Sequence, residues 1–207
     1  MSFGYDRQIE ASSGNANEVV FIKVDAQESV QVLAGNGTTN FGRIAAGAAL
    51  GKITATGKYR PVGKQVVGAT GSLTTVTMAS VAGFYVGDVV TAYDVSGDAA
   101  LATTRTITAI NTGTPSLTLS GAAITYDTGD YIYVEDGSAT ARGFNRADLF
   151  TIDSLDNNGQ PDAHDKGALL VYEGVVDEDK ADAIIKLNTY IKTDLQTVSN
   201  GCIIVFR

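Results

Sequence analysis

Short runs of Val, Ile, Thr and Tyr follow one another along the chain, and Gly, Asn or Asp interrupts them every few residues. Such side chains suit the pleated, half-buried surface of a strand, whereas Gly, Asn and Asp supply turns. Turn dipeptides recur at Asn36-Gly37, Asp136-Gly137, Asn158-Gly159 and Asn200-Gly201. Long helical periodicity is almost absent from the 207 residues. The sequence therefore predicts a mostly β fold.

Charge and composition narrow the function classes. The 15 Lys and Arg against 23 Asp and Glu give a net charge of −8, opposite to the basic surface that binds nucleic-acid phosphates. One cysteine and one histidine are too few for a disulfide framework and for most zinc sites or histidine relays. The apolar runs are too short to cross a bilayer, and the N-terminus has no apolar signal segment. We expect a soluble acidic protein that is not an enzyme and has no cofactor, metal site, nucleic-acid partner or membrane partner.

Charged residues are distributed unevenly, which predicts a domain boundary. Residues 65–135 contain one basic residue, six acidic residues and 14 of the 23 threonines, whereas the rest carries 14 basic and 17 acidic residues. A shift of this kind is typical of a separate folding unit. We predict an N-terminal arm and tether over residues 1–17, a host domain from residues 18–64 plus 136–207, and an inserted β domain over residues 65–135 that folds by itself.

The predicted insert has short strands with turns at nearly even spacing, which is typical of a small β-barrel or sandwich. The strands are expected over residues 73–78, 87–93, 104–110, 116–119 and 130–134. No cluster of lysines, histidines or carboxylates accompanies them, so we interpret the insert as a spacer or surface-enlarging domain. The alternative is a glycan-binding or host-receptor-binding module on a virion surface. A cluster of exposed rings on one face would support this alternative, because sugars stack on aromatic rings; the candidates are Phe84, Tyr85, Tyr93, Tyr126, Tyr131 and Tyr133.

The host segments contain the most informative motifs. Residues 43–62 (RIAAGAALGKITATGKYRPV) are typical of a turn, a strand, a tight turn and a second strand, with Gly57 where a hairpin needs positive φ. Residues 136–141 (DGSATA) follow the insert, and an apolar strand with an acidic end spans Leu169 to Ala181. In this order the segments Ala46 to Val62, Asp136 to Ala141 and Leu169 to Ala181 resemble the head decoration (capsid cement) proteins of tailed bacteriophages, the lambda-type family.

The resemblance implies a fold and a function for the host domain. It implies a β-tulip-like domain that forms a homotrimer on the outer surface of the phage head. Such a trimer clamps neighbouring major capsid protein subunits and stabilises the shell, without substrate or cofactor. A protein of this kind gains affinity from many shallow contacts repeated over a lattice rather than from one deep pocket.

The N-terminal residues predict a partner contact of their own. Phe3, Tyr5, Arg7 and Ile9 alternate with small or polar residues, the period of a strand, and residues 11–17 are small and polar, as in a flexible tether. A tethered strand can add to the exposed sheet edge of a partner, and the arm of the resembled family contacts the capsid. We therefore take Phe3, Tyr5, Arg7 and Ile9 as capsid-contact candidates. The alternative is a frayed terminus with incidental aromatic residues.

The segment from Ser154 to Asp165 matches part of a calcium-loop spacing, with oxygen-bearing residues at positions 1, 3, 5, 9 and 12. Ser replaces the usual first Asp, and Asp replaces the bidentate Glu, so we favour a solvated loop built from Asx-turns.

Two patterns near the C-terminus predict buried strands. Residues 183–192 alternate, with Ile185, Leu187 and Ile191 on one face, which predicts a strand. The run from Gly201 to Phe206 predicts a final strand in which Cys202 is a small core residue rather than a reactive thiol.

Overall fold

Strands dominate the computed structural model, so the prediction of a mostly β fold is confirmed. The described part of the chain comprises residues 21–33, 43–44, 46–68, 71–81, 83–95, 100–101, 103–147, 149–150, 166–177 and 189–207. An α-helix, α2 (Thr189–Gln196), and a short 3-10 helix, η2 (Val198–Asn200), precede the last strand. None of the helices in these ranges has the length and apolar character needed to span a bilayer.

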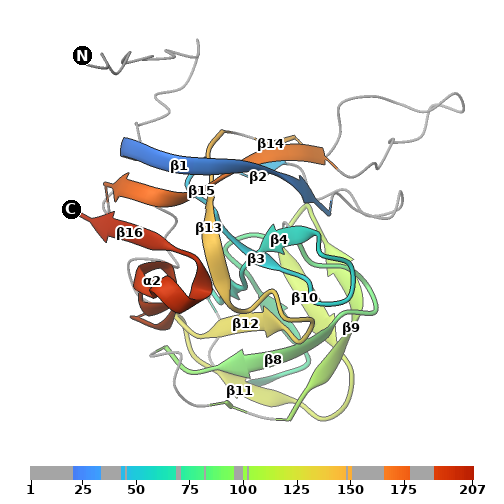
Figure 1. The fold of residues 1–207 in the computed structure, drawn as a ribbon. Helices are drawn as coiled ribbons and strands as arrows, with labels where there is room; N and C mark the ends of the chain where they lie inside the picture. Colours follow the sequence, from blue (N-terminus) through green and yellow to red (C-terminus); the bar gives the residue numbers. More distant parts are fainter. Residues whose placement is uncertain are drawn as a thin grey trace, which may run out of the picture.

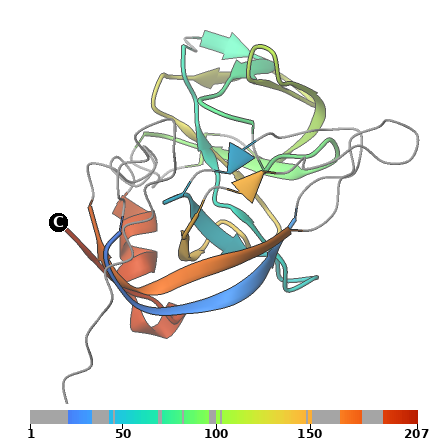
Figure 2. The same cartoon turned by 90° about the horizontal axis from the view of Figure 1, so that it is seen from above.

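The first sheet combines strands from both ends of the chain (Figure 1). Its order is β1 (Phe21–Val32), β4 (Tyr59–Pro61), β3 (Ala49–Lys52), β13 (Ala141–Asn145), β15 (Lys166–Val176) and β16 (Ile203–Phe206). β1 also pairs with β15 along almost its whole length, as the two long curved ribbons in Figure 2 show. The pairings therefore return from β15 to β1 and close into a ring, to which β16 adds in parallel along β15. A short pair, β2 (Arg43–Ile44) and β14 (Leu149–Phe150), forms a separate two-stranded sheet.

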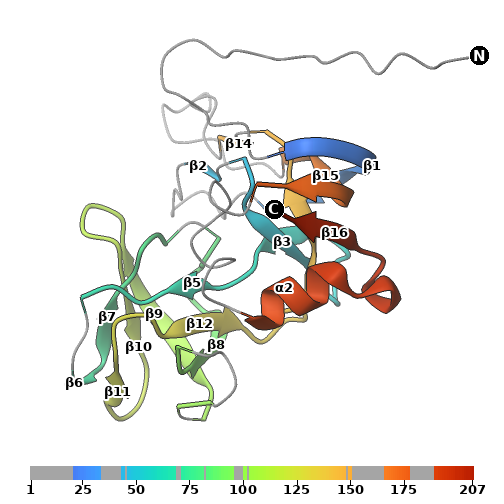
Figure 3. The same ribbon diagram turned by 90° about the vertical axis from the view of Figure 1, so that its left-hand side faces the viewer.

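The second sheet uses only strands between Lys64 and Val134 and lies beside the first (Figure 3). Its order is β5 (Lys64–Gln65), β12 (Tyr131–Val134), β8 (Val89–Tyr93), β9 (Arg105–Asn111), β10 (Ser116–Leu119) and β7 (Thr75–Thr77). A bridge between Val66 and Met78 connects the two ends of this order. A separate pair is formed by β6 (Gly71–Leu73) and β11 (Ile124–Tyr126). Backbone pairing thus separates residues 64–134 from the host strands.

Side-chain packing, in contrast, joins the two sheets. One buried cluster contains Val32 and Tyr59 from the host strands together with Val66 and Ile132 from the second sheet. A second cluster brings Tyr131 and Tyr133 of β12 against the helix residues Ile191 and Leu195 and the host-strand residue Phe144. Full burial of a large apolar side chain contributes about 1.5–3 kcal/mol to stability. Packing between the host strands and the second sheet therefore contributes substantially to the stability of the protein.

The strand predicted over residues 183–192 is wrong for its last residues, because helix α2 begins at Thr189. Ile191 and Leu195 are both buried, and residues four apart lie on one face of a helix. Residues 183–188 lie outside the described residues. The alternation of apolar and polar residues therefore did not determine the structure of this segment. The helix forms because the face that carries Ile191 and Leu195 packs against β13 and β16.

The prediction for the C-terminal run is confirmed at its key residue. Cys202 is completely buried beside β16, and Ile204 is buried while Ile203 and Val205 on alternate positions are exposed. Burial raises the pKa of the Cys202 thiol to about 11. The thiol is therefore protonated at neutral pH, as expected of a core residue.

Candidate functional site

The residues predicted to contact the capsid, Phe3, Tyr5, Arg7 and Ile9, lie outside the described residues. The calcium-like segment 154–165 lies outside them as well. Within the described ranges, no group of three or more His, Cys, Asp or Glu is placed to hold a metal ion. The candidate site is therefore built from the host strands and their junction with the second sheet.

The aromatic residues proposed as a sugar-stacking surface do not form one. Five of the six rings are buried, namely Phe84, Tyr85, Tyr126, Tyr131 and Tyr133, and the sixth, Tyr93, is partly buried. All four residues of β12 are buried, because one face of this strand packs on each of the two apolar clusters. An antiparallel strand normally has one buried face and one exposed face. Both faces of β12 are buried because the two sheets pack together, and the sequence did not indicate this packing.

Arg60 on β4 joins the host hairpin to the second sheet and to the segment that follows it. Its side chain is only 2% exposed. Nη1 donates to the Asp136 carboxylate at 2.9 Å and to the Asp88 carboxylate at 3.2 Å, while Nη2 contacts the other Asp88 oxygen. Nε donates to the Gly83 carbonyl at 2.9 Å, and the guanidinium carbon lies 5.1 Å from the centre of the Tyr85 ring. One side chain thus connects three segments that are distant in sequence.

Asp136 fixes the turn that opens the second motif. Its other carboxylate oxygen accepts a hydrogen bond from the Ser138 amide at 2.9 Å, and its carbonyl accepts one from the Thr54 amide at 2.9 Å. Gly51 on β3 packs directly against the Ser138 backbone, leaving no space for a side chain. The residues 46–62 and 136–141, which carry the resemblance noted above, are therefore in direct contact.

The charged side chains in this junction form ion pairs with one another. Burial alone would lower the pKa of Arg60, but the hydrogen bonds and charges of Asp88 and Asp136 outweigh burial and raise that pKa. Asp88 also accepts a hydrogen bond from the Tyr85 amide at 2.8 Å. These charge-assisted hydrogen bonds connect β4 to the segments that carry Asp88 and Asp136, which gives the junction a positioning role.

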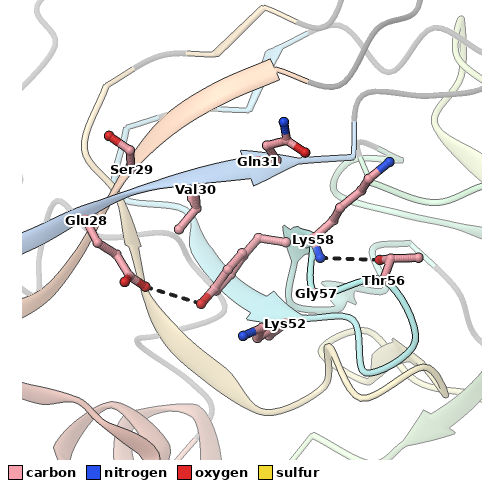
Figure 4. Close-up of a pocket in the computed structure, with 9 residues that line it drawn as sticks. Glu28, Ser29, Val30, Gln31, Lys52, Thr56, Gly57 and Lys58 are labelled. Carbon is pink, nitrogen blue, oxygen red and sulfur yellow. Dashed lines mark hydrogen bonds between the residues drawn. The ribbon is translucent and has the colours of Figure 1, made fainter.

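A shallow groove opens on the surface of the host strands next to this junction (Figure 4). One part, of about 290 Å³, lies between β1 and the β3–β4 hairpin and is lined by Glu28–Gln31, Lys52 and Thr56–Tyr59. An adjoining part, of about 330 Å³, shares Glu28, Lys52 and Tyr59 and adds Arg142, Tyr172 and Gly201. The groove is therefore lined by charged and phenolic side chains of the host domain.

Tyr59 lines both parts of the groove. Its hydroxyl donates to the Glu28 carboxylate at 3.4 Å, and the Lys52 ammonium lies 6.0 Å from the centre of its ring. Burial, followed by the nearby Glu28 charge, raises the pKa of Tyr59, so the phenol is protonated at neutral pH. Gly57, at the hairpin turn, has the positive φ of 72° that the sequence predicted. The groove can present ammonium groups, a carboxylate and phenols to a ligand.

Lys52 and Lys58 belong to the motif of residues 43–62, but that motif alone does not indicate the groove. Its opposite wall is β1, more than 20 positions earlier in the chain. No local pattern indicates that β1 lies beside the hairpin, because that placement depends on the long-range pairing of β1 with β15.

Comparisons with known proteins were made at three levels. No protein-family profile, curated protein or solved structure matches the chain. The proposal below therefore depends on the contacts described above and on the motif resemblance.

Proposed function

We propose that this chain is a structural virion protein that binds the outer surface of a tailed-bacteriophage head and cements neighbouring major capsid protein subunits. The observation that carries the proposal is the contact between residues 46–62 and 136–141. These segments carry the resemblance to the lambda-type decoration proteins, and the Arg60–Asp136 ion pair and the Gly51–Ser138 packing join them in one unit. Segments that form a family motif are expected to share one structural element.

In this proposal the ring of host strands corresponds to the β-tulip-like domain of the resembled family. The second sheet corresponds to an inserted small barrel or sandwich that enlarges the exposed surface. The shared apolar clusters hold the second sheet against the host strands, so a trimer of host domains would display three such sheets at defined positions.

The host domain acts as a homotrimer, at least when it is bound to the shell. Each subunit then contributes weak contacts that add through avidity. The arm residues Phe3, Tyr5 and Ile9 would add a strand to an exposed sheet edge of a capsid subunit, with Arg7 at the rim. Sedimentation of the free and head-bound protein tests the oligomeric state, and a stable dimer in both conditions would contradict this proposal.

The cementing function is tested by the thermal stability of heads. Heads that lack the protein are mixed with the full chain, with a variant lacking residues 1–10, or with buffer, and the temperature of DNA release is measured. We expect the full chain to raise this temperature. The shortened variant should bind at least about tenfold more weakly, because burial of each large apolar side chain contributes about 1.5–3 kcal/mol before ordering costs. Binding of the full chain without a rise in release temperature would overturn the cementing function.

Exposed rings within residues 65–135 would support the glycan- or receptor-binding alternative. Since five of its six candidate rings are buried, no observation on the described surface favours that function over shell binding.

A further inference from the structure

Among the described strands, β1 has one edge that is almost unpaired. Its other edge pairs with β15 from Phe21 to Val32. Among the described residues, the edge that faces the hairpin pairs with β4 only at Val32, opposite Tyr59, next to a hydrogen bond from the Leu33 amide to the Tyr59 carbonyl at 2.8 Å. Because β4 begins at Tyr59, residues 28–31 of β1 lie beside the hairpin turn that precedes β4, and the groove of Figure 4 lies between them. Within the described part of the chain, β1 therefore has an unpaired edge over residues 27–31.

Only part of this edge is regular enough to receive another strand. The pairing of β1 with β15 is irregular between Phe21 and Lys23, between Val24 and Ala26, and between Ala26 and Gln27. Bulges blunt exposed edges against unintended pairing. From Gln27 onward the register is continuous, which leaves the residues Gln27–Gln31, about 17 Å of strand, with a regular edge along the groove.

The charges beside this regular edge are mainly positive. Among the described residues that line the groove, the basic ones are Lys52 and Lys58 in the part next to β1 and Arg142 in the adjoining part, and the acidic one is Glu28. The chain as a whole carries a net charge of −8. A local excess of positive charge on an acidic protein attracts an acidic partner and repels further copies of the same acidic surface.

We propose that the β1 seam, defined as Gln27–Gln31 with Lys52, Lys58 and Arg142, binds an extended acidic segment of a partner protein by strand addition. Backbone hydrogen bonds to Gln27–Gln31 provide the adhesion, and the cationic side chains select acidic residues at alternate positions of the segment. The unpaired edge offers backbone amide and carbonyl groups, which an extended peptide backbone can match with hydrogen bonds. Polyanions without a peptide backbone cannot form such a ladder. This inference does not depend on the proposed shell function, because it uses only the geometry and charge of the host strands.

The test uses the full chain and a fluorescein-labelled octapeptide of alternating Thr and Glu, with binding measured by fluorescence anisotropy. Lys52→Glu combined with Lys58→Glu should weaken binding at least about tenfold, and the same positions changed to Gln should give an intermediate loss. The charge-matched control, Lys64→Glu with Lys192→Glu, lies outside both parts of the groove and should change binding less than about twofold. Thermal unfolding of each variant verifies that it is folded.

A second comparison separates strand addition from general charge attraction. The same peptide with alternate backbone amides N-methylated cannot complete a ladder of hydrogen bonds, so it should bind at least about tenfold more weakly. Hydrogen exchange of the complex should show added protection of amides within residues 27–31. Together these results would locate the peptide on the β1 edge.

Several outcomes would overturn the proposal. These are no measurable binding of the peptide, equal affinity for the groove variants and the control, or equal affinity for the N-methylated peptide. Equal binding of heparin and the peptide would assign the groove to polyanions in general. Peptide binding that appears only after removal of residues 1–10 would assign the seam to the N-terminal segment of this chain rather than to a partner.

Discussion

The Arg60 guanidinium on β4 and the Asp136 carboxylate, 76 positions later in the chain, form an ion pair of 2.9 Å. Residues 64–134, which build the whole second sheet, lie between them in sequence. The pair therefore joins the two ends of this segment, and Asp88, which directly precedes β8 of that sheet, shares the same guanidinium. The position of the second sheet on the host strands is thus coupled to one buried side chain.

Arg60→Met is expected to lower the free energy of unfolding by about 3–5 kcal/mol, because the Asp88 and Asp136 carboxylates lose the guanidinium with which they form ion pairs. Arg60→Lys should lose less, since it keeps the charge but not the forked geometry. Arg146→Met is the control, because the Arg146 side chain is exposed and donates a hydrogen bond to the Gln27 side chain at 2.8 Å; the substitution should cost less than about 1 kcal/mol. Urea denaturation measures all three, and equal losses for Arg60→Met and Arg146→Met would contradict the positioning role.

Gly51→Ala is expected to destabilise the protein by about 1–3 kcal/mol or more, because the added methyl group would overlap the Ser138 backbone. Gly167→Ala is a matched control on β15, where a methyl group meets nothing within 4 Å. The melting temperatures of the two variants are measured and compared, and that of Gly51→Ala should be the lower. If Gly51→Ala melts as the control does, the contact between the two motif segments is not as close as described.

Tyr126→Phe should change stability in a pH-dependent way. The Tyr126 side chain is fully buried, and its hydroxyl has no hydrogen-bond partner among the described residues, so its removal at neutral pH should be neutral or stabilising by up to about 1 kcal/mol. Burial raises the pKa of Tyr126 to about 12 from an ordinary value of 10.0. The folded state therefore holds this proton more tightly, and stability is lost as the pH rises from about 10 toward 12.

The variant should lose less stability than the unmodified chain over that interval. Denaturation series at pH 8, 10 and 11 provide the measurement. A parallel decline of both proteins with pH would show that Tyr126 ionisation does not contribute.

Removal of residues 65–135 is expected to destabilise the host domain, although the composition predicted an insert that folds by itself. The deletion takes away Gly83 and Asp88, which bond to Arg60, and Tyr131 and Tyr133, which pack in the cluster of α2. Arg60→Met in the shortened chain should recover part of the stability, because it removes a partly unpaired buried charge. Circular dichroism melting compares the chains, and a shortened chain as stable as the full one would show that the shared clusters contribute little.

The fold class could be predicted because β-forming residues and turn residues report locally on backbone conformation. The positive φ of Gly57 and the burial of Cys202 were predicted for the same reason, since each follows from a short pattern. The burial of Tyr131 and Tyr133 could not be predicted, because both faces of β12 are covered by segments distant in sequence. The partners of Arg60 and the β1 seam likewise depend on contacts between segments that are distant in sequence. Helix α2 depends on its packing against β13 and β16.

The proposed shell function is tested most directly by quantifying this chain in purified phage heads. The heads are washed in high salt, the mass ratio of this chain to the major capsid protein is measured, and intact heads are labelled with an antibody against residues 65–135. We predict a ratio that is constant between preparations and antibody labelling of intact heads, as expected of a protein that occupies a repeated position on the outer surface. Absence of the chain from washed heads, or its presence only in opened heads, would contradict the proposal.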